Sequence, residues 1–204
     1  MIILLFFLGH WYLSLFFQTF FLHRYTSHGM FKMNYFWEKT FFFLTFLVQG
    51  SSFLQPAAYG AMHRKHHSFS DTKKDPHSPV WSNNIFSFMW GTFKEYRNLS
   101  TQFLIDDSKS SDLPRWRFVE VLGESMIVRI LFVSFYSLFY WIYAPSAWFF
   151  LLIPFHIFMG PIHGFIVNWF GHKNGYRNHP ELSCLLYTSP SPRDQRGSRV
   201  PACA

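Results

Sequence analysis

Hydrophobic residues in this chain gather into four blocks that are separated by polar stretches. The first block, residues 1–22, is almost uninterrupted, and a helix of that length is long enough to cross a hydrocarbon core of about 30 Å. A signal peptide is a poorer explanation, because there is no basic N-terminal region and no cleavage site with small residues. We therefore expect the first block to form a transmembrane helix.

The three later blocks differ in their continuity. Residues 35–59 are interrupted by the sequence Gln-Gly-Ser-Ser at 49–52 and by Gln-Pro at 55–56. Residues 126–143 and 146–168 are joined by a short uncharged turn, which predicts a transmembrane hairpin.

The polar stretch at about 63–124 is rich in basic residues, whereas the turn at 143–146 has none. The positive-inside rule therefore predicts that this stretch forms a helical cap on the cytoplasmic side. Within it, residues 84–96 interleave aromatic and charged side chains, as in an amphipathic helix on the membrane surface or in a helix packed in a core. The pattern as a whole predicts an all-α, multi-pass integral membrane protein.

Composition and charge narrow the choice of partners. Half of the residues are hydrophobic, 23% are aromatic and only 14% are charged, unlike an ordinary soluble domain. The formal net charge of +7 is compatible with nucleic acid, an anionic membrane surface or an anionic substrate. The hydrophobic blocks favour the last two, so we expect membrane lipid and no nucleic acid as partners. Cys184 and Cys203 both lie near the C-terminus, which excludes a disulfide framework or thiolate metal site from the body of the chain.

Histidines cluster at the predicted ends of the hydrophobic blocks. His63, His66 and His67 have the spacing of one helix face, where imidazoles can converge on a metal. His23 and His28 lie about 140° apart around an α-helix, so they converge only if the helix ends between them. The glycine that follows His28 is a suitable place for that end.

A third cluster consists of Asn168 and His172 at the end of the last block. Each cluster alone could be a packed or solvated group, but ionisable residues at the ends of several membrane segments favour a functional site. Neutral imidazole suits iron, copper or zinc. A membrane protein that binds metal without catalysis is an alternative. His10, His156 and His163 lie inside predicted spans and are expected to pack or form hydrogen bonds there, with support of the site or of a substrate channel as the alternative for His156 and His163.

Three stretches resemble the histidine boxes of membrane fatty acid desaturases: FFLHRYTSHGMF at 20–31, HRKHHSFSDTKKDPHSP at 63–79 and NWFGHKNGYRN at 168–178. The likeness extends over about residues 1–182 and is greatest for the delta-9, acyl-CoA-desaturase-like branch in its bacterial form. The sequence Asp-Pro-His-Ser-Pro at 75–79 separates this branch from carotenoid and alkane hydroxylases.

The resemblance implies an enzyme that uses O2 and two iron ions to insert a cis double bond, at the delta-9 position, into a saturated acyl chain. The substrate would be an acyl-CoA or acyl-lipid, and electrons would come from a donor such as ferredoxin or cytochrome b5. By position, the resemblance assigns these iron ligands, the last acting through water: His23, His28, His63, His66, His67, His172 and Asn168. A di-iron hydroxylase of lipids or alkanes is the alternative.

Residues around the second box are given supporting roles. His77 and Asp75 are expected to orient the box. Arg64, Lys73 and Lys74 are expected to contact the substrate headgroup, although a solvated cytoplasmic face explains these three basic residues equally well.

The need for the ligands to meet restricts the topology. The block at 35–59 is expected to dip into the membrane and return, because a crossing would place the first two boxes on opposite sides. Its polar interruptions fit that path, since irregular backbone at membrane depth must be buried in protein. The other three blocks would cross, with the N-terminus outside the cytoplasm; a further span before the start of this sequence is the alternative to that orientation.

The chain departs from the family in one respect. A further H-x2-H-H box, which supplies three more ligands in the family, does not occur in this sequence. We therefore expect residues 1–183 to form an incomplete desaturase domain that binds iron poorly and is inactive. Residues 184–204 are rich in Pro, Ser and Arg and are expected to be a disordered tail derived from a cloning adapter, with a natural disordered tail as the alternative.

Overall fold

The computed structural model describes residues 1–70, 72–75, 77–106 and 112–173, except for the side chains of residues 172 and 173. All regular elements in these ranges are helical. The predicted all-α fold is therefore confirmed. The predicted tail at 184–204 and the domain boundary at 183 lie outside the described residues.

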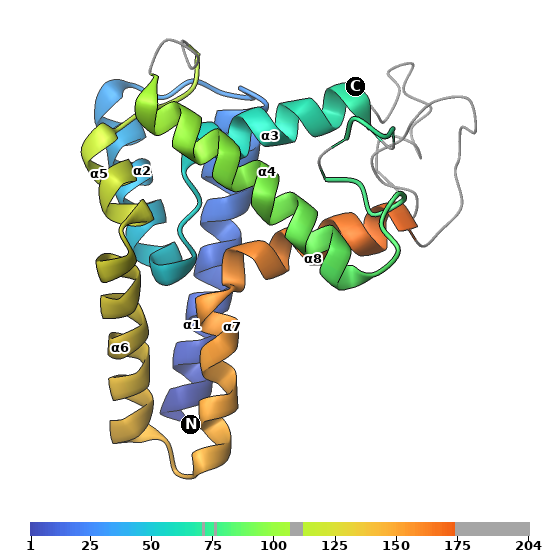
Figure 1. Ribbon diagram of the computed structural model, residues 1–204. Helices are drawn as coiled ribbons and strands as arrows, with labels where there is room; N and C mark the ends of the chain where they lie inside the picture. Colours follow the sequence, from blue (N-terminus) through green and yellow to red (C-terminus); the bar gives the residue numbers. More distant parts are fainter. Residues whose placement is uncertain (71, 76, 107–111, 174–204) are drawn as a thin grey trace, which may run out of the picture.

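The helices form a column with a cap at one end (Figure 1). The column contains α1 (Ile2–Phe17), α6 (Met126–Tyr143), η4 (Ala147–Leu152) and α7 (Ile153–Ile157). The cap contains α3 (Pro56–Phe69), α4 (Ile85–Ile105) and α5 (Arg117–Glu124). The N-terminus lies at the end of the column remote from the cap (Figure 1).

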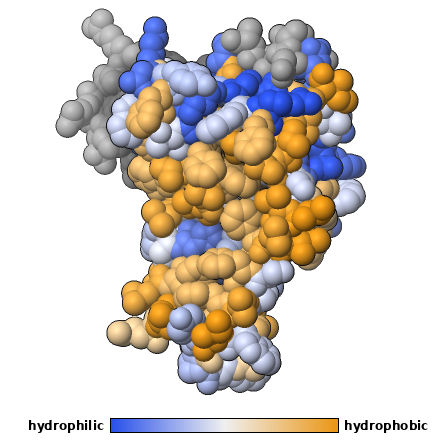
Figure 2. Space-filling model, turned by 90° about the vertical axis from the view of Figure 1, so that its left-hand side faces the viewer, coloured by the Kyte–Doolittle hydropathy of each residue, from blue (hydrophilic) through white to orange (hydrophobic). Residues whose placement is uncertain are grey.

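The column has the surface of a membrane-embedded protein. Within the described ranges, two helices are long and apolar enough to span a membrane, Ile2–Ser27 and Met126–Tyr143, and two bent pairs would raise the number to four. Only 22% and 11% of the apolar windows of these two helices are buried inside the protein. Figure 2 shows polar residues gathered on the cap and mostly hydrophobic residues below it. Lipid rather than water suits so large an apolar surface.

The second hydrophobic block forms a bent pair instead of one crossing helix. Tyr35–Ser52, which contains α2 (Tyr35–Gln49) and η2 (Gly50–Ser52), meets α3 at 82°. α3 then returns to the chain that follows α1, where the ring nitrogens of His63 and His28 lie 3.1 Å apart. The pair thus begins and ends at the same end of the column, which agrees with the predicted return.

Polar side chains satisfy the backbone at this turn. Gln49 Oε1 accepts the N–H of Leu54 at 3.1 Å, and Ser52 Oγ donates to the Gln49 carbonyl at 2.9 Å. Pro56 begins α3, where a missing N–H costs no helical hydrogen bond. These contacts supply the internal partners that irregular backbone needs at membrane depth.

The fourth hydrophobic block is not the single helix that its sequence predicts. Ala147–Ile157 meets α8 (Met159–Lys173) at 72°. Pro161 lies in the first turn of α8 and has no N–H to offer the carbonyl of Ile157, so a straight helix cannot continue through this point.

Neighbouring side chains hold this bend in place. Ser52 Oγ accepts the N–H of Gly160, and Gln18 Nε2 donates to the carbonyl of Gly160, each at 3.3 Å. α8 consequently turns sideways beneath the cap (Figure 1), which carries Asn168 to His77 on the loop after α3.

The predicted helix at 84–96 is longer than expected and has two different faces. Asn84 caps α4, because its Oδ1 accepts the N–H of Ser87 at 2.8 Å. One face buries Phe88, Tyr96 and Phe103. The other exposes Phe86, Trp90 and Phe93. The packed alternative is therefore correct for the inner face.

Gly50→Ala should destabilise the protein more than Gly29→Ala. Both glycines have positive φ, 53° and 57°, which costs another residue at least about 1–2 kcal/mol, and the ψ of -120° at Gly50 lies outside the left-handed helical region, so its cost is the larger. A β-carbon on Gly50 would also collide with the hydroxyl of Tyr136, whereas one on Gly29 meets nothing within 4 Å. Thermal unfolding in detergent measures both losses, and the clash should add about 1–3 kcal/mol. Equal losses would show that Tyr136 does not constrain the turn.

Candidate metal centre

The first histidine pair lies on a π-helix. η1 (Gln18–Ser27) continues α1, and the N–H of His28 bonds to the carbonyl of His23 at 3.1 Å. This i to i+5 pattern places residues five apart above one another, and the two ring centroids are 4.5 Å apart. The helix ends at Ser27, between the two histidines as expected, with His28 as its C-cap, and its last turns are wider than those of an α-helix. Gly29 follows the helix with φ 57°, where the sequence predicts a stop.

The second histidine set faces this pair from α3. His28 Nε2 lies 3.2 Å from His23 Nε2 and 3.1 Å from His63 Nε2. His67 Nε2 lies 2.9 Å from His63 Nε2. One nitrogen from each of His23, His28, His63 and His67 lies within 4.8 Å of the others. These four residues are the histidine cluster.

The histidine cluster has the geometry of a metal site. Imidazole nitrogens about 2.0–2.1 Å from an ion, at tetrahedral or octahedral angles, are separated by roughly 2.8–3.4 Å. The contacts between 2.9 and 3.2 Å match that spacing. Burial, and secondarily the Arg64 guanidinium, lower the pKa of His28, which favours the neutral form that binds metal. The donor set suits iron, copper or zinc.

His66 lies beside the histidine cluster but not in it. Its ring centroid is 6.1 Å from that of His63 and 5.8 Å from that of His67. Its Nδ1 lies 2.8 Å from both carboxylate oxygens of Asp75, which is fully buried. The carboxylate fixes the tautomer with a proton on Nδ1, so that Nε2 carries the lone pair, as in histidines that ligate metals.

Asn168 and His77 form a second polar group next to His66. His77 Nε2 accepts from Asn168 Nδ2 at 2.7 Å, and its Nδ1 donates to Thr92 Oγ1 at 3.2 Å. The same amide donates to the carbonyl of Gly164 at 2.8 Å. The His77 ring centroid is 5.7 Å from that of His66. His172 lies on α8, and its side chain lies outside the described part.

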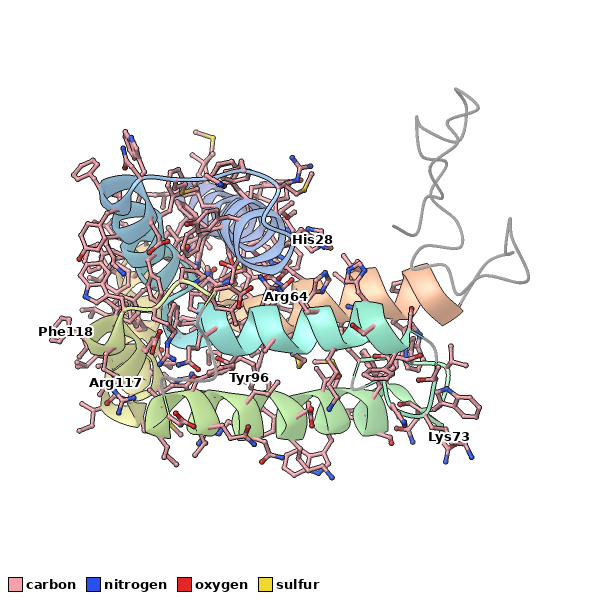
Figure 3. All side chains as sticks on the ribbon, turned by 90° about the horizontal axis from the view of Figure 1, so that it is seen from above. His28, Arg64, Lys73, Tyr96, Arg117 and Phe118 are labelled. Carbon is pink, nitrogen blue, oxygen red and sulfur yellow. The ribbon has the colours of Figure 1, made fainter. Side chains whose placement is uncertain are left out.

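Arg64 joins the two histidine boxes, a role that the sequence does not reveal. Its Nε donates to the carbonyl of Ser27 at 2.8 Å and its Nη2 to that of Thr26 at 3.0 Å, and it forms an ion pair with Asp112. Figure 3 shows Arg64 close to His28, where α3 passes the end of η1. Because the chain holds several basic residues nearby, no sequence signal separates this one from the rest.

Lys73 and Lys74 lie away from the histidine cluster. Both are exposed on the loop after α3, and Figure 3 shows Lys73 far from His28. The ammonium of Lys73 lies 5.5 Å from the ring of Trp81, and that of Lys74 lies 5.8 Å from the ring of Phe69.

His63→Ala should weaken metal binding at the histidine cluster much more than His66→Ala. The first change removes the nitrogen that contacts both His28 and His67, whereas the second leaves the histidine cluster intact. Titration with Co2+, followed by its visible absorption, should show a loss of more than about tenfold in affinity for His63→Ala. Equal losses in the two variants would contradict the four-residue cluster.

Arg64→Met should destabilise the contact between the two boxes. The carbonyls of Thr26 and Ser27 would lose their donors, which costs about 1–3 kcal/mol. Lys65→Met is the matched control, because it removes only a part-exposed ion pair with Glu95 at 2.6 Å and should cost at most about 1 kcal/mol. Denaturation in detergent gives both values, and a larger loss for Lys65→Met would exclude this role of Arg64.

The chain is similar to known proteins over most of its length. It matches the family model for fatty acid desaturases over residues 1–193. It is also similar to the Delta-9 desaturase-like 5 protein of Arabidopsis thaliana, with 37% identity over 76 residues, which are 35% of this chain and 23% of that protein. The Delta-9 desaturase-like 3 protein of the same plant is 36% identical over 72 residues, or 33% and 23% of the two chains.

The match thus spans less than a quarter of the length of these relatives. No solved structure matches the chain. The family model nevertheless covers nearly all of the sequence, including every residue of the histidine cluster. The chain therefore belongs to the fatty acid desaturase family.

Proposed function

We propose that this protein is an O2-dependent fatty acyl desaturase that inserts a cis double bond, at the delta-9 position, into a saturated acyl chain. The observation that carries the proposal is the convergence of four imidazoles at one end of a membrane-embedded column. Membership of the family supplies the class of reaction. The names of the Arabidopsis relatives support the delta-9 position.

Two iron ions would bind where the column meets the cap. The first would be held by the histidine cluster. The second would be held by His66 and His172, with Asn168 acting through water. The carboxylate of Asp75 supports the role of His66, because it leaves Nε2 as the lone-pair nitrogen. His77 supports the role of Asn168, whose amide it holds at 2.7 Å.

Bound iron would supply O2 activation and the removal of hydrogen from neighbouring acyl carbons. The residues of the chain contribute by positioning. Arg64 fixes α3 against η1, and Asp75 fixes the ring of His66. Each of these contacts limits the freedom of a ligand before the metal binds, which is the usual role of residues that bond to metal ligands.

The acyl substrate, carried by CoA or a lipid, would approach from the membrane at the cap. Exposed Lys73 and Lys74 would contact its headgroup, whereas Arg64 is occupied with backbone carbonyls and Asp112. The basic cap would face the cytoplasm under the positive-inside rule. There it would meet an electron donor such as ferredoxin or cytochrome b5.

The fatty acid composition of desaturase-deficient cells tests the proposal. The cells should express the native protein, from a transcript read past the codon for Leu182, so that any further histidine box is included. Monounsaturated acyl chains should appear with the native protein and be absent with His63→Ala, which removes a central member of the histidine cluster. Gas chromatography of the methyl esters identifies the product and the position of the double bond.

Lys65→Met is the matched control, because it changes α3 two residues after His63 without touching the histidine cluster. It should preserve the unsaturated product. An alcohol in place of the alkene would replace the proposal with the hydroxylase alternative. Bound iron with an unchanged acyl profile would favour a membrane protein that binds metal without catalysis.

A further inference from the structure

A second group of histidines lies inside the column, away from the histidine cluster, and two of its members are fully paired. His10 Nε2 donates to the carbonyl of Val48 at 2.6 Å, so its Nδ1 must accept. His156 Nδ1 therefore donates to His10 Nδ1 at 2.6 Å, and its Nε2 accepts from the hydroxyl of Tyr140 at 2.9 Å. One set of neutral tautomers gives every ring nitrogen of His10 and His156 a hydrogen-bond partner. These two histidines are therefore part of a structural hydrogen-bond network. It also agrees with the expected packing of His10 and His156.

His163 differs from these two histidines. Only 4% of it is exposed, yet neither ring nitrogen has a hydrogen-bond partner among the described residues. Its ring stands edge-on to that of Trp11, with centroids 4.5 Å apart, which places it in the interface between α1 and α8. Ser14 lies one turn beyond Trp11 on the same face of α1, fully buried, and its hydroxyl also has no partner in the described part of the chain.

Three unpaired polar atoms in one buried interface are costly. Each unsatisfied group costs about 1–3 kcal/mol. Such groups are rarely left bare, and buried water is the usual partner, with about three hydrogen bonds for each molecule. The interface also contains Gly160 and Gly164, which carry no side chain that could serve as a donor or acceptor.

The same interface leads toward the histidine cluster. Gln18, one turn beyond Ser14 at the start of η1, interacts with the hydroxyl of Tyr59, whose ring is parallel to that of His63 at 5.8 Å. A β-carbon on Gly164 would lie 4.0 Å from Gln18 Nε2 and 3.9 Å from His77 Nε2. Polar groups therefore continue from the middle of the column to both parts of the candidate metal centre.

We propose that the interface between α1 and α8 holds ordered water bound by Ser14 and His163, and that this water is part of a proton path toward the metal centre. The second half of this proposal rests on the proposed function. Each desaturation would consume one O2, two electrons from the external donor and two protons, would remove two hydrogens from the acyl chain, and would release two waters. A centre buried against lipid therefore needs a route for protons and water.

Radiolytic footprinting tests the bound water without any need for activity. A brief X-ray pulse on the native protein in nanodiscs, in H2 18O, generates hydroxyl radicals from bound water, and these radicals oxidise adjacent side chains. Trp11 and His163 should acquire 18O. His156 is the internal control, because it is equally buried but fully paired and should stay unmodified. No 18O on either Trp11 or His163 would overturn the proposal.

Ser14→Val removes one proposed ligand of the water and should lower the modification of His163 at least severalfold. Ser137→Val makes the same chemical change on α6, beside a lipid-facing groove of about 620 Å³, and should leave it unchanged. Equal modification in both variants would overturn the assignment of Ser14.

In active protein, Ser14→Val should also raise the amount of peroxide released for each double bond formed. An unchanged ratio of peroxide to double bonds would overturn the proton path while leaving the water site in place.

Discussion

The return of α3 to the end of η1 is the constraint on which the candidate site depends. His23 and His28 end the first membrane helix, and His63 and His67 lie only one bent helix pair later. A straight crossing by the intervening block would separate these pairs by about 30 Å, the thickness of the hydrocarbon core. The turn at Gly50 prevents that separation. It is stable because Gln49 and Ser52 satisfy its backbone, and because α6 packs closely enough for Tyr136 to contact Gly50.

Polar side chains also satisfy the backbone at other places where the helices of the column depart from regular geometry. Ser52 and Gln18 supply hydrogen bonds at the bend before α8, and Ser27 Oγ donates to the carbonyl of Leu22 within the π-helix at 2.8 Å. Lipid offers these backbone groups no hydrogen-bond partners, so each of these irregular turns is fixed by a polar side chain from another element or another turn. The column therefore needs both its apolar surface, which contacts lipid, and its polar interior, which satisfies the irregular backbone. The bends position the ligands, and the buried polar residues stabilise the bends within the membrane.

Much of this arrangement can be predicted from the sequence. The block at 126–143 became α6 with the same bounds, and the histidine boxes identified the family. Helical periodicity correctly predicted that His63 and His67 lie on one face of a helix. It also predicted His66 on that face, but the buried carboxylate of Asp75 holds the ring of His66 away from the histidine cluster. The contact of Arg64 with η1 was not predictable, because it depends on the meeting of segments about 37 residues apart. The bend of the fourth block had a signal in Pro161, which a count of hydrophobic residues overlooks.

The π-helix shows why the first two boxes cannot be considered separately. Its wide turns bring His23 and His28 together, but they are a rare and less stable form of helix, so a neighbour must compensate. That neighbour is α3, since Arg64 donates to the carbonyls of Thr26 and Ser27 at the end of η1. The second box thus contributes two imidazoles and also holds the first box in the shape that presents the other two. A change that separates α3 from η1 would therefore remove ligands from both boxes at once, even where every histidine is retained.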